Sequence, residues 1–401
     1  MIRPLPILVI LPLLLLCGGK NPAPAPVEYP DWNRCIVNSQ SELPRMDAVV
    51  DSFMRFWALQ GVSIAVTRHD SLLYARGYGK ADHSTLMTPG TTMRLASVSK
   101  LLTAIGVMRL QEEGKLYLDT PVFGPYGVLK EYDGCISDDN YYLMTVEHLL
   151  RHQGGFHYRG GDVMFSGYHP DREVFLRQEL RKALAFTPGT WQQYSNFGYF
   201  LLSIVIEKAA GMPYEEFMQK EVFAPCGCRE FRIAGNYLSD RHPGESMYFM
   251  QPDAELVTSF DGKYSAVQKC YGGNDVTSLM GAGAWVGSAV ELARVVSSIN
   301  GLDGVEDILS GDSIQKMTTW YDEDTFSLGW VDTKDGEWTR TGSFSGTSAL
   351  VKVFPDGESW VLISNTSAWR GSRFSRNTSY LVKNLRRRFS DSLPRRDLFS
   401  E

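Results

Sequence analysis

Residues 93–102 read Met-Arg-Leu-Ala-Ser-Val-Ser-Lys-Leu-Leu, and they begin an apolar helical pattern that continues to Glu113. The spacing of three places Ser97 and Lys100 side by side on one helix face. A serine hydroxyl becomes a nucleophile when a neighbouring base removes its proton, and a desolvated lysine can be neutral enough to do so. Alone, the pattern also fits a solvated helix start. A second Ser-x-x-Lys at 313–316 is interpreted as an ordinary polar helix face.

Tyr194-Ser195-Asn196 directly precedes a second apolar helical segment, 196–209. A tyrosine beside cationic groups can hold a lowered pKa and pass a proton between nucleophile and leaving group, which makes Tyr194 a candidate catalytic residue. The amide of Asn196 has a donor and an acceptor that could orient Lys100 or a substrate amide. The plainer alternative makes Tyr194 an aromatic residue at a helix start and Asn196 its N-cap.

Arg340-Thr341-Gly342-Ser343 lies on a predicted strand at the edge of the same site. Gly342 would let a ligand approach the backbone closely, because glycine has no side chain. Arg340 supplies a permanent cation that suits a substrate carboxylate, and Thr341 and Ser343 add hydroxyl groups beside it. The alternative interpretation is a solvated arginine at a strand end, followed by a turn.

Taken in order, these three motifs resemble those of the serine β-lactamase and penicillin-binding-protein family, in its class C and D-alanyl-D-alanine carboxypeptidase branch. The stretches 93–96, 147–155, 194–199 and 211–215 are also similar to that family, and the resemblance covers about residues 43 to 389. One departure is that the third motif begins with Arg340 where Lys or His is usual. This departure affects the expected substrate and leaves the expected chemistry intact.

The resemblance implies a role for each motif residue. Ser97 would be the acyl-enzyme nucleophile, and Lys100 and Tyr194 would share general-base and general-acid work. Asn196 would orient groups in the site, and Arg340, Thr341, Gly342 and Ser343 would bind substrate. The backbone N–H groups of Ser97 and Ser343 would form the oxyanion hole. The family needs no cofactor and no metal for this chemistry, and the expected partner is a small-molecule or peptide substrate.

The two ends of the chain predict one α+β domain, an antiparallel sheet flanked by N- and C-terminal helices with a mainly helical inserted region at about 92–310. Helical spacing of apolar residues covers 43–59 and 378–389. Alternating patterns predict strands at 62–67, 72–77, 326–331, 337–341, 348–354 and 358–363. The domain is expected to span 43–389, followed by a tail at 390–401.

The first 20 residues have the pattern of an export signal, with Arg3 before a short apolar segment, 5–16. Residues 14–19 resemble a bacterial lipoprotein cleavage site, which predicts a lipid anchor at Cys17, whereas Leu16 in place of a small residue favours an ordinary signal peptide. Both alternatives predict export to the periplasm or cell envelope. A Pro-rich spacer, 21–42, follows. The net charge of −6 gives no basic footprint for nucleic acid.

The sequence allows three rival interpretations. An α/β-hydrolase would need Gly-x-Ser-x-Gly, and the segment 342–346 has Phe344 at the central place. His148 and His152, with His157 nearby, suggest a metal site, but the glutamate of His-Glu-x-x-His is missing between the first two. The third rival is a penicillin-binding sensor that is acylated without turnover. The sequence leaves the choice among β-lactam, D-amino-acid peptide and ester substrates open, and also the oligomeric state.

Overall fold

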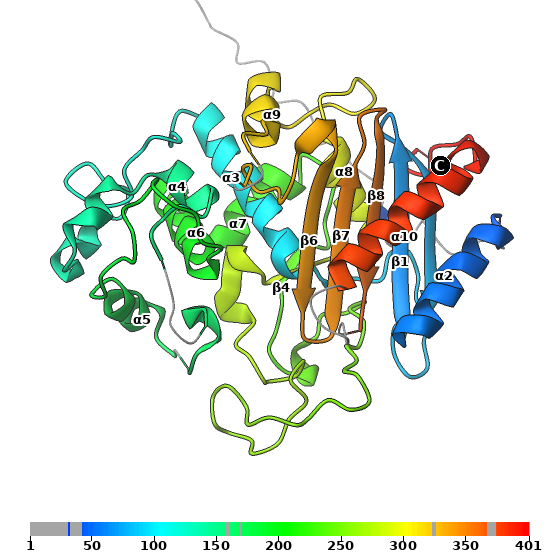
Figure 1. Ribbon diagram of the computed structural model, residues 1–401, viewed down its shortest axis with the longest axis horizontal. Helices are drawn as coiled ribbons and strands as arrows, with labels where there is room; N and C mark the ends of the chain where they lie inside the picture. The colour runs from blue at the N-terminus through cyan, green and yellow to red at the C-terminus, as the bar shows by residue number, and fades with distance from the viewer. Residues whose placement is uncertain are drawn as a thin grey trace, which may run out of the picture.

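The computed structural model describes residues 31–32, 42–156, 161–168, 170–322, 326–366 and 374–400. These residues build a five-stranded antiparallel sheet in the order β2-β1-β8-β7-β6 (Figure 1). The strands are β1 (Gly61–Arg68), β2 (Ser71–Gly79), β6 (Trp338–Phe344), β7 (Thr347–Val353) and β8 (Glu358–Ser364). The first and last thirds of the chain therefore share one sheet, in which β1 pairs directly with β8.

Two helices from opposite ends of the chain cover one face of the sheet, α2 (Pro44–Trp57) and α10 (Phe374–Phe389) (Figure 1). The strands bury alternate residues on the two faces, since successive side chains point to opposite sides. On β8, Trp360 and Leu362 join the core under α2 and α10, whereas Val361 and Ile363 join the core on the other face. Burial on both faces explains why the middle of each strand, 349–351 in β7 and 360–363 in β8, is an unbroken apolar run.

The opposite face packs against α8 (Ala289–Ser297) and the helical region beyond it. That region contains α3 (Ser99–Glu112), α4 (Val146–Leu150), α5 (Arg172–Glu179), α6 (Asn196–Ala210), α7 (Tyr214–Met218) and α9 (Gly311–Thr318). A small sheet, in the order β3-β5-β4, comprises β3 (Met93–Arg94), β5 (Trp285–Gly287) and β4 (Arg232–Ile233). In Figure 1, α3 runs along the boundary between the sheet and the other helices.

The predicted α+β architecture is confirmed, and so are the strands β1, β2, β7 and β8. The strand predicted at 326–331 is wrong. Gly329 has a φ of +83°, and a Cβ there would lie 2.7 Å from Cβ of Ala104 on α3. The alternating apolar residues of this segment are buried as a loop against α3, and only Val331 and Asp332 bond to β6, through Thr339.

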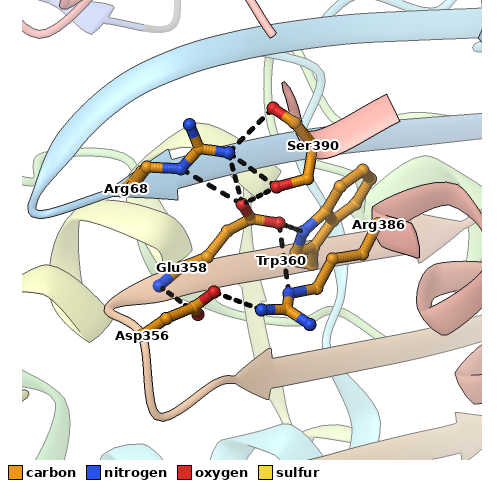
Figure 2. A network of polar contacts seen from close by, with 6 residues as sticks. All are labelled: Arg68, Asp356, Glu358, Trp360, Arg386 and Ser390. Carbon is orange, nitrogen blue, oxygen red and sulfur yellow. Dashed lines mark hydrogen bonds and ion pairs between the residues drawn. The ribbon is translucent and has the colours of Figure 1, made fainter. Parts of the chain in front are cut away.

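A buried carboxylate joins the C-terminal end of the chain to the sheet (Figure 2). The side chain of Glu358, at the start of β8, accepts hydrogen bonds from Trp360 Nε1 at 2.6 Å, Ser390 Oγ at 2.6 Å and Arg68 Nη2 at 2.7 Å. Arg386, near the end of α10, bonds to Asp356 in the turn before β8. The network fixes the end of α10 and the residues after it to two central strands.

The residues that the sequence left as a tail also pack against the sheet. The backbone N–H of Leu72 on β2 donates to Asp397 Oδ1 at 2.9 Å, and its carbonyl accepts from Leu398 N at 2.9 Å. Trp32 Nε1 donates to the carbonyl oxygen of Phe399 at 3.3 Å. The folded unit therefore continues to the last residues described. The predicted export signal and nearly all of the spacer lie outside the described residues.

Candidate active site

Ser97 lies on a tight turn between β3 and α3. A 3-10 turn, Ala96–Val98, connects the strand to the helix. Ala96 has a φ of +48°, a conformation that non-glycine residues rarely adopt and that costs of the order of 1–3 kcal/mol. Strained backbone of this kind is often found at functional sites. The turn holds the Ser97 side chain half-buried at the first turn of α3, directly beside Lys100.

Gly342 explains how β6 reaches this turn. A Cβ at Gly342 would lie 2.3 Å from the carbonyl oxygen of Leu95 and 3.0 Å from the backbone nitrogen of Ser97. No side chain fits in that space, so glycine is required for the strand and the nucleophile turn to touch. The sequence predicted that Gly342 allows close approach of a ligand. The structure shows that the close approach is made by the protein's own backbone.

Lys100 is fully buried and surrounded by acceptors. Its Nζ donates to Ser97 Oγ at 3.3 Å, to Asn196 Oδ1 at 2.7 Å and to the carbonyl oxygen of Ala282 at 2.5 Å. Burial lowers the pKa of Lys100, and the nearby charge of Arg340 lowers it further, while Tyr194 acts in the opposite direction. Lys100 is therefore within hydrogen-bond reach of Ser97, and its lowered pKa favours acceptance of the serine proton.

Tyr194 contacts the same hydroxyl from the other side. Its OH donates to Ser97 Oγ at 2.8 Å, and Lys100 Nζ lies 4.8 Å from the centre of its ring. Burial alone would raise the pKa of Tyr194, but the positive charges of Lys100 and Arg340 outweigh this effect and lower it to about 8. Ser97, Lys100 and Tyr194 thus form one proton-sharing group, in which Lys100 is fully buried and the other two side chains are half-buried.

Arg340 is brought into the site, but it is committed to the protein's own groups. The side chain is 1% exposed. Its Nε donates to the carbonyl oxygen of Ser97 at 2.8 Å, and its Nη2 donates to Tyr194 OH at 3.4 Å. Nη1 is buried and has no hydrogen-bond partner in the described part of the chain. This geometry gives a fixed charge beside the proton-sharing group, and the expectation that Arg340 reads a substrate carboxylate stays a prediction.

Asn196 begins α6, and its side chain holds Lys100 as predicted for an orienting residue. The alternative in which Asn196 is the N-cap is wrong, because Ser195 caps the helix through Gly198 N at 3.0 Å. The backbone N–H of Asn196 donates to Asp162 Oδ2 at 2.7 Å. No motif or periodic pattern marks Asp162, which lies in a loop.

The outer edge of β6 supplies a backbone N–H donor in addition to the N–H of Ser97. Thr339 makes its backbone bonds on the side away from β7, to Val331 and Asp332. In an antiparallel strand, every second residue directs its backbone groups to the same side, so the N–H of Ser343 also points to this outer edge. A cavity of about 270 Å³ there is lined by both Ser97 and Ser343. These are the positions expected of an oxyanion hole.

His148 and His152 bond to separate backbone groups and do not come together as the rival metal site. His148 Nδ1 accepts from Thr145 N at 3.3 Å, whereas His152 Nδ1 accepts from Ser195 N at 3.2 Å. His152 lies against the Tyr194 ring, and burial holds its pKa well below the usual value. No cluster of metal-binding side chains occurs among the residues that the structure describes. His157 lies outside them.

The comparison with protein families matches residues 46–384 to the family described as Beta-lactamase. Among curated relatives, the Esterase EstB of Burkholderia gladioli is 33% identical over 208 residues, 48% of this chain and 52% of the esterase. Penicillin-binding protein 4* of Bacillus subtilis is 30% identical over 41% of this chain and 35% of its own length. A putative D-alanyl-D-alanine carboxypeptidase of Escherichia coli is 26% identical over 73% and 72%. The chain thus spans about half of the first relative and a third of the second.

Solved structures show the same fold. The D-amino acid amidase of Ochrobactrum anthropi matches with a TM-score of 0.69 and 18% identity, over 88% of this chain and 100% of the amidase. A penicillin-binding protein of Bacillus halodurans matches with a TM-score of 0.64 and 20% identity, over 84% and 98%. At these identities the likeness concerns the fold alone.

Proposed function

Because the chain belongs to the Beta-lactamase family, we propose that it is a serine hydrolase that works through an acyl-enzyme on Ser97. The observation that carries the proposal is the position of one hydroxyl between two proton carriers. Ser97 Oγ lies 2.8 Å from Tyr194 OH and 3.3 Å from Lys100 Nζ, in a site where the lysine is fully buried and the tyrosine is half-buried. Hydrogen-bond reach between nucleophile and base is the geometric requirement for this chemistry.

The proton pathway follows from these contacts. Ser97 Oγ attacks the substrate carbonyl carbon, and its proton passes to the Lys100–Tyr194 pair. The oxyanion is stabilised by the N–H groups of Ser97 and Ser343. Tyr194 then gives a proton to the leaving group as its bond to the carbonyl carbon breaks, which leaves an ester on Ser97. Water attacks this ester and loses its proton to the same pair, which returns a proton to Ser97 Oγ as the bond between Oγ and the acyl carbon breaks, so that the acid and the free serine are released.

Arg340 bears on the substrate class. Its Nε and Nη2 bond to the chain itself, so in the described part of the cleft it offers no exposed fork to a terminal carboxylate. This favours uncharged esters and amides. The hydroxyls of Thr341 and Ser343 line the same cavity and could bind a carboxylate as neutral donors. Because of these two donors, D-amino-acid peptides and β-lactams are the second substrate class in the proposal. The relative named as a carboxypeptidase agrees with this class.

The test combines labelling and turnover on the purified protein. A fluorophosphonate probe should add its mass to the peptide that carries Ser97, and Ser97→Ala should abolish the label. Ser313→Ala, in the second Ser-x-x-Lys motif, is the matched control and should label normally. Steady hydrolysis of a 4-nitrophenyl ester is expected. A single burst without turnover would instead indicate the sensor, and labelling that survives Ser97→Ala would refute the proposal.

Export is proposed separately, from the sequence of residues 1–20. Among the described residues, no helix is long and apolar enough to cross a membrane. Expression of the full chain in a bacterial host, followed by fractionation and mass determination of the mature N-terminus, tests the proposal. A lipid-bearing Cys17 that is lost in Cys17→Ser would support the lipid anchor. An uncleaved N-terminus in the cytoplasm would contradict export.

A further inference from the structure

A second cavity, of about 330 Å³, lies along α6 outside the proton-sharing group. Its apolar walls come from several helices and loops of the helical region, namely Met164, Phe175, Phe200, Tyr214, Ile233 and Met280. Cavities of this volume with mostly apolar walls and a few polar groups are typical of small-molecule sites. The three catalytic motifs contribute no residue to its lining, although Pro213, Tyr214 and Glu215 belong to the family-like stretch 211–215.

Two residues that line this cavity are close in sequence to residues that make the catalytic contacts. Met164 lies two residues after Asp162, whose carboxylate holds the backbone of Asn196. Met280 lies two residues before Ala282, whose carbonyl oxygen holds Lys100 Nζ. Met280 has a φ of 43° and a ψ of −123°, a strained conformation for a residue with a side chain. Met280 therefore lines the cavity, and Ala282, in the same segment, supports Lys100.

The chemistry at Ser97 indicates which half of a substrate could reach this cavity. The leaving group must lie near the Tyr194 hydroxyl, and the oxyanion near the edge of β6. The acyl substituent is therefore directed to the remaining side, where Asn196 and Ala282 lie. With a rise of 1.5 Å per residue along α6, the cavity residues Phe200 and Glu207 lie about 6 Å and 16 Å beyond Asn196. An acyl group that fills the cavity must therefore be long.

The charged side chains that line this cavity further limit which ligands it can bind. Four charged side chains line the cavity, Arg172, Glu207, Glu215 and Asp275. Arg172 pairs with Glu207 at 3.0 Å. The other two carboxylates accept hydrogen bonds from neutral groups, Glu215 from Ile233 N and Asp275 from Ser278 Oγ and Asn236 Nδ2. The charged lining is therefore net negative, which disfavours an anionic occupant and accepts a neutral or cationic one.

We propose that this cavity binds the acyl half of the substrate, as a long apolar group, aromatic or branched, that is neutral or carries an amine. The proposal rests on the proposed function, because it names the substrate class of the same site. It predicts an enzyme that prefers bulky acyl groups to acetyl, and that discriminates against acyl groups with a second carboxylate.

The first test compares two esters with one leaving group, 4-nitrophenyl acetate and 4-nitrophenyl 4-phenylbutyrate. Ile233 lines the cavity and is half-buried, so Ile233→Trp should fill it. The ratio of kcat/KM for the phenylbutyrate to that for the acetate should fall about tenfold or more, the scale of lost apolar contacts in a pocket. Leu256→Trp, at a position 61% exposed and outside the cavity, should keep the wild-type ratio. An Ile233→Trp ratio within twofold of wild type would overturn the proposal.

The second test needs no turnover. Calorimetric titration of Ser97→Ala protein with 4-phenylbutylamine and with 4-phenylbutyrate should give at least about tenfold tighter binding of the amine. Asp275→Asn should reduce this preference, and Ile233→Trp should abolish binding of the amine. Equal binding of the two probes, or binding that survives Ile233→Trp, would overturn the proposal. Failure of the proposed function is seen separately, as an unlabelled Ser97 in a protein that still binds the amine.

Discussion

Replacement of Arg340 by alanine should move the pH dependence of catalysis without removing the nucleophile or its proton carriers. The guanidinium Nη2 lies 3.4 Å from Tyr194 OH, and its charge helps to lower the pKa of Tyr194 to about 8. A phenolate accepts a proton whereas a phenol cannot, so kcat/KM of the free enzyme should rise with pH through this pKa. Loss of the nearby cation should shift that rise to higher pH.

The magnitude follows from the geometry. A unit charge 4 Å away in a medium of dielectric constant near 20 contributes about 4 kcal/mol, and one pKa unit corresponds to about 1.4 kcal/mol. That charge alone would account for about three pKa units, but Tyr194 is half-buried and solvent screens part of the effect, so a rise of about one to two units toward the ordinary tyrosine value of about 10 is expected. At neutral pH this corresponds to a roughly ten- to hundredfold loss, which should shrink as the pH is raised.

The assay is kcat/KM for a neutral ester between pH 6 and pH 10, for wild type, Arg340→Ala and Arg340→Lys. The lysine variant keeps a charge and should retain most of the wild-type profile, although it loses the second donor of the guanidinium. Thermal unfolding of each variant controls for loss of structure. An alanine profile that is lowered equally at every pH, with an unchanged midpoint, would show that Arg340 is only structural and would refute the electrostatic role.

Three further outcomes are expected. Lys100→Arg, which cannot act as a base, and Tyr194→Phe, which lacks the hydroxyl, should each lower ester turnover about 10²-fold or more, and a near-normal rate in either variant would exclude that residue. Gly342→Ala places a Cβ 2.3 Å from a backbone oxygen and should lower both turnover and melting temperature, whereas Gly134→Ala, with no atom within 4 Å of its Cβ, should leave both unchanged. Glu358→Gln should lower the free energy of unfolding by about 3–5 kcal/mol, measured by urea denaturation, because the buried amide keeps only one accepting oxygen and turns an NH2 group toward the donors of Arg68, Ser390 or Trp360, and a change below about 1 kcal/mol would contradict that account.

The sequence predicted those parts of the molecule that depend on local pattern. The helix after Ser97 and strands β7 and β8 follow from short-range periodicity, and their bounds agree with the structure to within a few residues. The segment 326–331 has the same alternation, but its contacts with α3 come from a distant part of the chain. Periodicity cannot distinguish a strand from a loop that buries every second residue against a helix.

The candidate site was predicted as a set of residue types, and the structure supplied their arrangement. The proximity of Ser97, Lys100 and Tyr194 could be expected from the order of the motifs. The burial of Arg340 could not, because it depends on β6 lying directly on the nucleophile turn through Gly342. Asp162 likewise lies in an irregular loop, where no periodic signal marks a functional side chain.

The pairing of β1 with β8 has a consequence for the order in which the protein can be assembled. Val62 is the register partner of Ser364, so the central strand pair joins segments from opposite ends of the chain. Contacts so distant in sequence carry a large loop-closure cost and are typical of slow-folding topologies. A growing chain that already contains all three motifs, through residue 343, still lacks β7 and β8 and cannot close its sheet. Until then the apolar edge of β1 lacks its partner strand, and a nascent chain that pauses there should be prone to aggregation.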